Sequence, residues 1–527
     1  MAIFDMHTLW SGKQFDLHSL LNGNRFDLDA LWPAHQTKSN QPRIRGGVHP
    51  EQRKEATADR PIDLGLPLPP MLYLALQQHV GKPAEPIVNV GDRVLKGQLL
   101  AVSQGLVSAP IHAPTSGVVA DVMDYPSAHP SALPTPTLLL EPDGEDRWIA
   151  LPDKIDPFSL SPEEISLRVG AAGVVGLGGA AFPSAVKLNL GRRTNIQTLL
   201  INGGECEPYL TCDDRLMRER ARVIVDGILI MLHGLGCQKA IVGIEDNKLE
   251  AYTTMRMAAA ELSDGKIDIA LVPSFYPMGW DKQLIGYLTG KEVPADGRAT
   301  DVGVLMHNVG TAYAVQQAIR HGRPLISRIV TVSGGAVGSP RNVEALIGTP
   351  LSSLLAHCGY RPKDAFRHVM GGPMMGDALP HPNVPLVKGA CGILALTREE
   401  VSATDAKPCI RCSRCVTACP VGLQPLEMVS RIRAGQLEAS LKFGMKDCIS
   451  CGSCSYVCPS EIPLVHYFKY ANGELLTRDQ ANHKAEQTKK LAEEKLARLA
   501  RQKQEAAAAA AQRKAAAKKP KITEEAA

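Results

Sequence analysis

The chain has 527 residues, of which 44% are hydrophobic and 21% charged, with a formal net charge of +4. A chain of this length is too long for a single hydrophobic core, so we expect several domains. No stretch approaches the roughly 20 consecutive apolar residues of a membrane-spanning helix, and the N-terminus lacks the basic and apolar regions of a secretory signal. These features predict a soluble or peripheral protein that is not secreted.

Charge and cysteines are distributed unevenly along the chain. From Leu476 to Ala527 there are thirteen Lys or Arg against seven Asp or Glu, a surplus of +6 that leaves the rest of the chain at about −2. Five cysteines lie outside two dense runs, scattered and odd in number: Cys206, Cys212, Cys237, Cys358 and Cys391. This pattern disfavours a disulfide framework and predicts a reducing, cytoplasmic environment.

Residues 1–43 carry an 11-residue repeat in three copies, Phe4–Trp10, Phe15–Leu21 and Phe26–Trp32. Each copy places apolar side chains on one side of a short helical turn, and such a unit cannot bury its own apolar face. Two hypotheses remain open: docking of the repeats onto a partner, and packing of the repeats onto the body of the protein.

Residues 44–150 are rich in Pro and Gly with short Val and Leu runs, which predicts strands and turns. Gly91-Asp92-Arg93-Val94 and Ala113-Pro114-Thr115-Ser116-Gly117 resemble the barrel-sandwich hybrid fold of biotinyl and lipoyl carrier domains. The connection between the two halves, Ser103–Ser108, has no lysine to carry a prosthetic group. We therefore expect a structural or interface role for this domain.

Residues 151–325 alternate strand-like and helical segments, which is typical of a mostly parallel, Rossmann-like α/β sheet. The predicted strands are 198–202, 240–244 and 269–272, and the predicted helix 215–233 is closed by Gly234 and Gly236. Residues 326–396 open with the apolar run 329–333 and predict a small β-rich domain.

Residues 397–475 contain the run C-x-x-C-x-x-C-x-x-x-C-P twice, bridged by a predicted helix over 431–441. Three thiolates of such a run bind one [4Fe-4S] cube, and the fourth thiolate crosses over from the other run. We assign cluster one to Cys409, Cys412, Cys415 and Cys458, and cluster two to Cys448, Cys451, Cys454 and Cys419. Zinc is disfavoured because its sites take two separated C-x-x-C pairs. The sequence therefore predicts an α-helical ferredoxin domain that relays electrons.

Residues 476–527 form an Ala- and Lys-rich tail that is helical or disordered, with no apolar stripe beyond about Leu499. Because no aromatic residues are interleaved with the basic ones, we expect a solvated tail, or one near anionic lipid, and no binding of nucleic acid.

The α/β domain carries a glycine-rich loop, Gly176-Leu177-Gly178-Gly179-Ala180, that leads towards Lys187. Glycines allow backbone N–H groups to approach a phosphate or flavin ring closely, although a tight turn is an alternative interpretation. Asn202, Glu205 and Glu207 follow the strand 198–201 directly, at the edge where open α/β sheets bind ligands. The sequence therefore predicts a ligand site at this edge.

The pattern G-x-G-G-x-x-F-P followed by N-x-x-E-x-E-P resembles the NADH-binding flavoprotein subunit of respiratory complex I, whose site precedes a β-grasp-like domain and then cysteines. Residues 44–470 resemble still more closely the RnfC family, which belongs to the bacterial Rnf ion-translocating electron transport complexes. Gly46-Gly47-Val48-His49-Pro50 and the doubled cysteine runs carry this resemblance.

The resemblance implies noncovalent FMN, NADH as substrate and two [4Fe-4S] clusters. For the flavin it implies Gly176, Gly178, Gly179, Ala180, Lys187, Asn202, Glu205 and Asn308; for the nicotinamide nucleotide it implies Phe182 and Glu207, with Tyr276 and Asp281 in a further nucleotide contact. The last of these elements departs from the family's Gly-Gly-Glu, because Trp280 and Asp281 occupy its final two places.

The predicted function is an electron-entry subunit that passes electrons from NADH through FMN and two clusters to integral membrane and ferredoxin-like subunits, with ferredoxin or flavodoxin linked indirectly. Such a protein lies peripherally on the cytoplasmic face of the bacterial inner membrane. Two alternatives stay open: a soluble NADH:acceptor diaphorase subunit, and a relay and scaffold subunit without its own flavin site. Hydride transfer needs no general base, so no catalytic side chain is expected.

Overall fold

The structure is a computed structural model that describes residues 44–152, 155–401 and 405–517. The 11-residue repeats at the N-terminus lie outside the described residues. None of the described helices is both long enough and apolar enough to span a bilayer.

Two small antiparallel sheets form the first domain, as predicted for a barrel-sandwich hybrid. Their orders are β1-β7-β6-β3 and β2-β4-β5. The strands are β1 (Leu72–Ala75), β2 (Glu85–Pro86), β3 (Arg93–Val94), β4 (Leu99–Val102), β5 (Ile111–His112), β6 (Gly117–Pro126) and β7 (Pro134–Pro142). The connection 103–108 lies between β4 and β5, and its Leu106 is 85% exposed. A segment ahead of this domain contains the short helix α1 (Glu55–Ala58).

A four-stranded parallel sheet forms the α/β domain, with strand order β10-β9-β8-β11. The strands are β8 (Thr198–Gly203), β9 (Lys239–Glu245), β10 (Ile267–Val272) and β11 (Val304–Asn308), which contain the three predicted strands. The helices and turns are η2 (Pro157–Ser159), α2 (Pro162–Ala171), α3 (Ser184–Arg193), α4 (Cys212–Leu235), α5 (Leu249–Leu262), α6 (Asp281–Thr289), η3 (Ala299–Val302) and α7 (Val309–His321).

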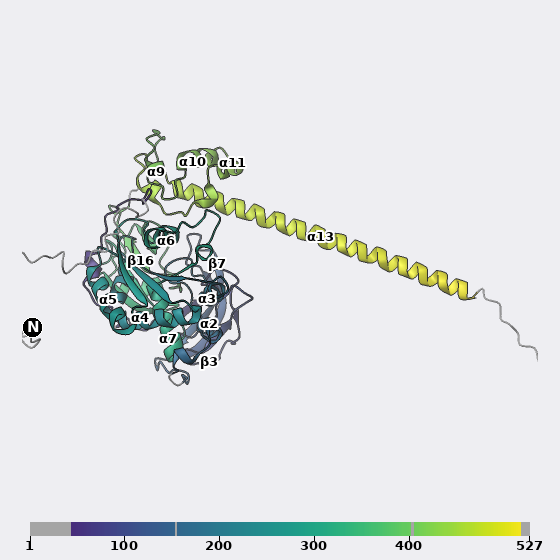
Figure 1. Cartoon of the computed structure of the whole chain (residues 1–527), viewed down its shortest axis with the longest axis horizontal. Helices are drawn as coiled ribbons and strands as arrows, with labels where there is room; N and C mark the ends of the chain where they lie inside the picture. Colours follow the sequence, from purple (N-terminus) through teal and green to yellow (C-terminus); the bar gives the residue numbers. More distant parts are fainter. Residues whose placement is uncertain (1–43, 153–154, 402–404, 518–527) are drawn as a thin grey trace, which may run out of the picture. The chain divides into compact units, whose positions relative to one another are not determined.

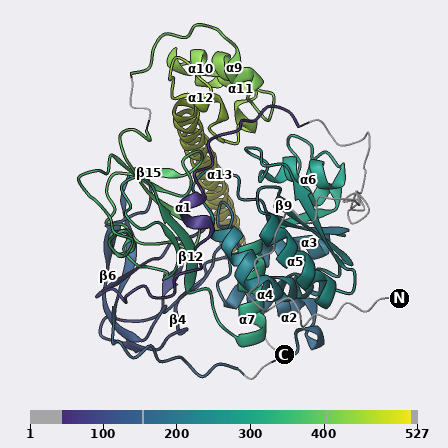
Figure 2. The same ribbon diagram turned by 90° about the vertical axis from the view of Figure 1, so that its left-hand side faces the viewer.

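Helices cover both faces of this sheet, because its strands carry apolar residues on both sides. Leu199 and Ile201 of β8 face a core shared with α4 and α7, whereas Leu200 packs with Leu284 and Ile285 of α6. Figure 2 shows α4, α5 and α7 together beside the sheet. The strand order reverses between β8 and β11, and open α/β sheets bind their ligands at such a reversal.

Helix α4 is longer than the predicted 215–233. It begins after Thr211 with Asp213 and Asp214 in its first turn, where carboxylates favour the positive end of the helix dipole. It ends at Leu235, capped by Gly236 in the left-handed conformation (φ 65°). Gly234 lies inside the helix and does not close it.

A mixed five-stranded sheet, with order β13-β12-β16-β14-β15, forms the predicted β-rich domain. Its elements are β12 (Ser327–Ser333), β13 (Arg341–Leu346), α8 (Leu351–His357), β14 (Arg367–Met370), β15 (Asp377–Leu379) and β16 (Gly392–Leu396). Its apolar residues form a core of their own around Val330, Val343 and Leu354.

The ferredoxin domain is built from short helices around the root of one long helix (Figure 1). These are α9 (Arg414–Thr417), α10 (Pro425–Arg433), α11 (Leu437–Leu441), η4 (Met445–Asp447), α12 (Ser453–Tyr456) and α13 (Leu464–Ala517). The predicted single helix over 431–441 is wrong, because Gly435 in a left-handed conformation (φ 72°) separates α10 from α11. Met428 and Phe468 centre the core of this domain.

The tail is helical as far as Ala517, so the helical form of the prediction holds for its described part. Leu476, Leu491, Leu496 and Leu499 are exposed on α13, which agrees with the absence of a buried apolar stripe. The helix is anchored only at its N-terminal end, where Leu464, Phe468 and Ala471 are buried.

Candidate functional site

The glycine-rich loop lies directly over the end of β11. A Cβ atom on Gly178 would lie 2.9 Å from the side chain of Asn308, so this close approach requires glycine. The Leu177 N–H donates to Thr311 Oγ1 (3.0 Å), and the Leu177 carbonyl accepts from Arg328 (3.2 Å). The loop is therefore held from the α7 side, and the chain continues from it into α3.

Two asparagine side chains fix the strand ends on either side of the strand-order reversal. Asn202 Oδ1 accepts from the Gly204 N–H (2.8 Å), and its Nδ2 donates to the Gly279 carbonyl (3.0 Å). Asn308 Oδ1 accepts from the Gly310 N–H (2.7 Å), and its Nδ2 donates to Asp213 (2.6 Å). These amides bring the loops after β8, β10 and β11 to one place.

Glu205 is buried and its carboxylate caps the N-terminus of α4. It accepts from the N–H groups of Asp213 (3.0 Å) and Asp214 (3.3 Å) and from the Cys212 thiol (3.2 Å). Burial raises the pKa of Glu205, although the nearby Lys54 partly opposes this shift. In this structure Glu205 shapes the start of the helix beside the site.

Glu207 connects the loop after β8 to the β-rich domain. Its carboxylate accepts from the N–H groups of Met374 (2.9 Å) and Met375 (2.8 Å), and burial raises its pKa to about 7. Tyr276 lies beside it: the Tyr276 hydroxyl donates to the Cys451 carbonyl (2.6 Å) and interacts with the Glu207 side chain. The structure thus places Tyr276 between the α/β domain and the second cysteine run, apart from the glycine-rich loop.

Lys187, Asp281 and His307 form a polar group beneath the loop. Lys187 donates to the Met306 carbonyl (3.0 Å), and burial lowers its pKa while the charge of Asp281 opposes the shift. His307 precedes Asn308 on β11, is 3% exposed, and among the described residues neither of its ring nitrogens has a hydrogen-bond partner.

Sequence reasoning did not single out His307, because an isolated histidine gives no motif. Its unpartnered nitrogens, beside the close approach of Gly178 to Asn308, fit a polar ligand such as a flavin. Phe182 is half-buried in the same loop, where its carbonyl accepts from the Gly176 N–H (2.8 Å).

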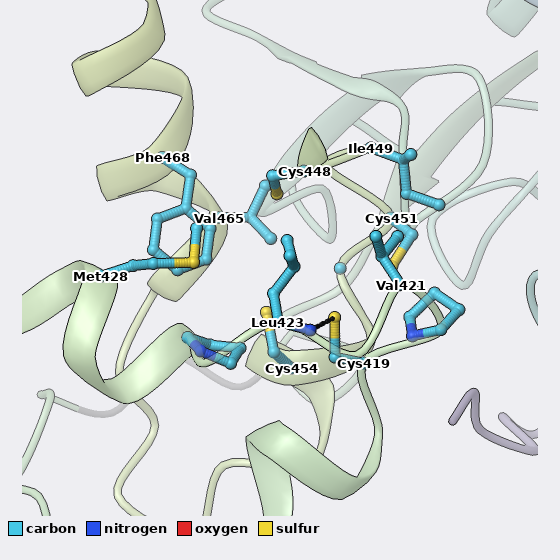
Figure 3. Close-up of a pocket in the computed structure, with 13 residues that line it drawn as sticks. Cys419, Val421, Leu423, Met428, Cys448, Ile449, Cys451, Cys454, Val465 and Phe468 are labelled. Carbon is cyan, nitrogen blue, oxygen red and sulfur yellow. Dashed lines mark hydrogen bonds between the residues drawn. The ribbon is translucent and has the colours of Figure 1, made fainter. Parts of the chain in front are cut away.

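Eight cysteines line two separate cavities in the ferredoxin domain. One cavity is lined by Cys419, Cys448, Cys451 and Cys454, together with apolar residues such as Val465 and Phe468. Figure 3 shows these four sulfur-bearing side chains surrounding a shared space, with Cys419 accepting from the Leu423 N–H (3.3 Å). The second cavity is lined by Cys409, Cys412, Cys415 and Cys458.

Each cavity thus combines three cysteines of one run with the fourth cysteine of the other, as the predicted cluster assignment requires. Two such sets of four thiols in an apolar shell fit two cubic iron-sulfur clusters. Among the residues that the structure describes, no three His, Cys, Asp or Glu side chains are placed to hold a single metal ion.

Three segments from other domains contact the loops that carry the cluster-two cysteines. The Gly47 N–H donates to the Ala418 carbonyl (2.8 Å), and Tyr276 holds the Cys451 carbonyl. Gly452 approaches Met374 so closely that a Cβ atom on it would lie 2.7 Å from the Met374 carbonyl. Val48, Tyr276, Ala418 and Cys451 share one buried cluster as a result.

Comparison with protein families divides the chain as the fold does. An RnfC barrel-sandwich hybrid domain matches residues 42–145, and a Nuo51 FMN-binding domain matches residues 169–317. An SLBB domain matches residues 329–378, and a 4Fe-4S dicluster domain matches residues 408–462.

A full-length relative decides the family. The RnfC protein of the ion-translocating oxidoreductase complex of Rhodobacter capsulatus is 49% identical over 440 residues, which cover 84% of each chain. This chain belongs to the RnfC family. The corresponding protein of Pseudomonas aeruginosa is 45% identical over 457 residues, covering 86% of this chain and 58% of the relative.

A solved structure, an NAD+-reducing [NiFe]-hydrogenase in the H2-reduced state, is 20% identical with a TM-score of 0.44, covering 57% of this chain and 61% of that one.

These findings confirm the predicted family, the multidomain fold class and the identity as an oxidoreductase complex subunit with FMN-binding and two-cluster domains. They exclude the zinc interpretation of the cysteine runs, because the matching domain is a 4Fe-4S dicluster domain. The individual flavin and nucleotide contacts and the domain boundaries stay predictions.

Proposed function

We propose that this chain is the subunit at which electrons from NADH enter an ion-translocating complex. The observation that carries this proposal is the contact between the two redox domains: Tyr276 follows β10 of the α/β domain, and its hydroxyl donates to Cys451 of the second cysteine run (2.6 Å). A flavin site and a cluster site joined by a buried side chain are suited to direct electron transfer.

The residues at the strand-order reversal would hold FMN. Gly178 leaves room above Asn308, Lys187 supplies a positive charge, and His307 offers ring nitrogens that have no other partner among the described residues. When bound, FMN accepts a hydride from NADH and releases the electrons one at a time. Gly176, Gly179, Ala180, Asn202 and Glu205 complete the proposed flavin surroundings.

Phe182 and Glu207 are the proposed contacts of the nicotinamide nucleotide. Because Glu207 has its pKa raised to about 7, it carries less negative charge near neutral pH than an exposed glutamate, which reduces repulsion of an anionic nucleotide. Asp281 lies on the side of Lys187 and remains a proposed contact, whereas the Tyr276 hydroxyl is committed to Cys451.

The ferredoxin domain presents its two cysteine sets differently. The set with Cys451 contacts the α/β domain, so it would hold the cluster nearer to the flavin. Cys409 and Cys412 of the other set are exposed, which suits delivery of electrons to a partner.

We propose that this partner is a ferredoxin-like or integral membrane subunit of the same complex, with ferredoxin or flavodoxin linked indirectly. The chain would lie peripherally on the cytoplasmic face of the inner membrane.

A relay and scaffold protein without flavin is the second candidate, and Trp280 supports it. Trp280 replaces the glycine expected at a nucleotide-contacting turn and precedes α6 directly. A bulky indole there restricts access to the strand end, which would leave the clusters to be reduced by another subunit.

An anaerobic visible spectrum of the cluster-loaded protein, with and without FMN and before and after NADH, tests the proposal. Bleaching of the flavin band together with the iron-sulfur absorbance is the expected result. Clusters that dithionite reduces but NADH does not, with no retained flavin, would favour the relay candidate.

Gly178→Val is the matching variant, because its side chain would meet Asn308. We expect FMN binding on the order of tenfold to a hundredfold weaker. Gly473→Ala, in α13 where a Cβ meets nothing within 4 Å, should leave FMN binding unchanged and serves as the control.

A further inference from the structure

A segment ahead of the hybrid domain, residues 46–57, runs across the α/β domain and ends at the loop 204–211. We call residues 46–57 the strap. At its start, Val48 pairs with Tyr276 through backbone hydrogen bonds of 2.9 and 3.0 Å. At its end, Thr57 Oγ1 meets Thr211 Oγ1 at 2.8 Å. The strap therefore contacts both the turn after β10 and the loop that carries Glu205 and Glu207.

Lys54 makes the central contact between the strap and this loop. Its ammonium donates to the backbone carbonyls of Glu205 (2.5 Å), Leu210 (2.6 Å) and Glu207 (3.0 Å). A lysine ammonium has three N–H donors, so all three are used on one loop. The side chain is 9% exposed, and water cannot easily replace it as the donor.

The bonding pattern determines which way the loop faces. Three carbonyls turned towards Lys54 leave the carboxylates of the loop to point elsewhere: Glu205 towards the first turn of α4, and Glu207 towards Met374 and Met375. The neighbouring residues of the strap support this arrangement, since the Tyr209 N–H donates to the Gln52 carbonyl (2.8 Å) and Arg53 donates to the Tyr209 hydroxyl (2.9 Å).

We propose that Lys54 is a positioning residue for the redox site: it holds the loop 204–211 in the one conformation that presents Glu205 and Glu207 to FMN and the nicotinamide nucleotide. The proposal rests on the proposed function for what the loop contacts. A lysine that acts only on the stability of the fold would leave the ligand affinities of the folded protein unchanged.

Lys54→Met removes the three donors and keeps the length of the side chain. Because three buried carbonyls lose their partners, we expect the loop to leave this conformation. In the folded variant, amide hydrogen exchange over 204–211 should be at least about tenfold faster, and the Kd for FMN and the KM for NADH should both rise about tenfold or more, while kcat changes less than about threefold.

Lys54→Gln keeps two donors and should give intermediate values; this graded series decides the proposal where the Met variant does not fold. Lys82→Met replaces an exposed lysine of the hybrid domain and should match the wild type in every measurement. Unchanged hydrogen exchange over 204–211, or faster exchange with unchanged Kd and KM, would overturn the proposal.

The exchange measurement keeps this proposal separate from the proposed function. A wild-type protein that binds no FMN would refute the proposed function, and it would remove the redox role of Lys54 with it. A wild-type protein that is reduced by NADH, combined with Lys54 variants that bind and react normally, would refute only the role of Lys54.

Discussion

The two cysteine sets of the ferredoxin domain share one motif but lie in different surroundings. In the cluster-two set, Cys451 and Cys454 are each 7% exposed, and the loop around them is held by Tyr276 and Met374 from other domains. In the cluster-one set, Cys409 and Cys412 are exposed. The same ligand pattern thus serves a buried site next to the α/β domain and a site open to solvent.

This difference indicates a direction in the relay. Electron transfer within a chain favours a short, dry contact, whereas transfer to another protein needs an accessible surface. The surroundings of each set, rather than the spacing of its cysteines, therefore distinguish an inner cluster from an outer one.

Loss of a cluster-two ligand should have the largest effect on this comparison. We expect Cys451→Ser to remove or alter the inner cluster and to stop NADH from reducing the outer cluster, because the link to the α/β domain is broken. Electron paramagnetic resonance of the NADH-treated and dithionite-treated protein measures both clusters separately.

Cys412→Ser is the matched variant in the outer set. It should disturb the outer cluster and leave the inner cluster fully reducible by NADH. Equal loss of NADH reduction of the remaining cluster in both variants would contradict an inner-to-outer order.

The contact made by Tyr276 should have a smaller effect. Tyr276→Phe removes the hydrogen bond to the Cys451 carbonyl, and we expect a loss of about 1 kcal/mol in stability. Reduction of the inner cluster by NADH should slow a few-fold, on the scale of that one lost bond, while cluster content stays unchanged. Stopped-flow absorbance with Tyr470→Phe, an exposed tyrosine of α13, as the control checks this expectation.

The smallest expected effect is a pH dependence at Glu207, on the inner side of the molecule. Burial raises the pKa of Glu207 from 4.5 to about 7, so folding favours its protonated form. The stability from this shift is fully present below pH 4.5 and is lost as the pH rises through 7.

We therefore expect the Tm of the wild type to fall by about 2 to 4 °C more than that of Glu207→Gln between pH 5.5 and 7.5. Thermal denaturation of the cluster-loaded proteins at both pH values measures this difference. Equal Tm changes in the two proteins would show that Glu207 titrates at the same pH in the folded and unfolded states.

Local patterns predicted much of the architecture, because strands and glycine turns follow from nearby residues. The apolar run 198–202 became β8, and the doubled cysteine runs became two cavities with the crossed fourth ligand. The helix predicted over 431–441 failed because Gly435 adopts a left-handed conformation that interrupts it. Periodicity alone could not show that interruption.

The roles of several site residues depended on distant parts of the chain. Tyr276 was predicted as a nucleotide contact, yet its hydroxyl lies on Cys451, 175 positions away. Lys54 attracted no attention in the sequence, because its partners are backbone carbonyls, which leave no mark on the identity of residues 205, 207 and 210.

The sequence by itself determined the ligand set of the clusters and the family of the chain, since thiolate spacing and long motifs are properties of the covalent order of residues. Only the tertiary structure decided which cluster lies inside, which carboxylates are buried, and what Lys54 and Tyr276 hold. Burial and hydrogen bonding between segments far apart in the chain arise from packing, and packing exists only once the domains have come together.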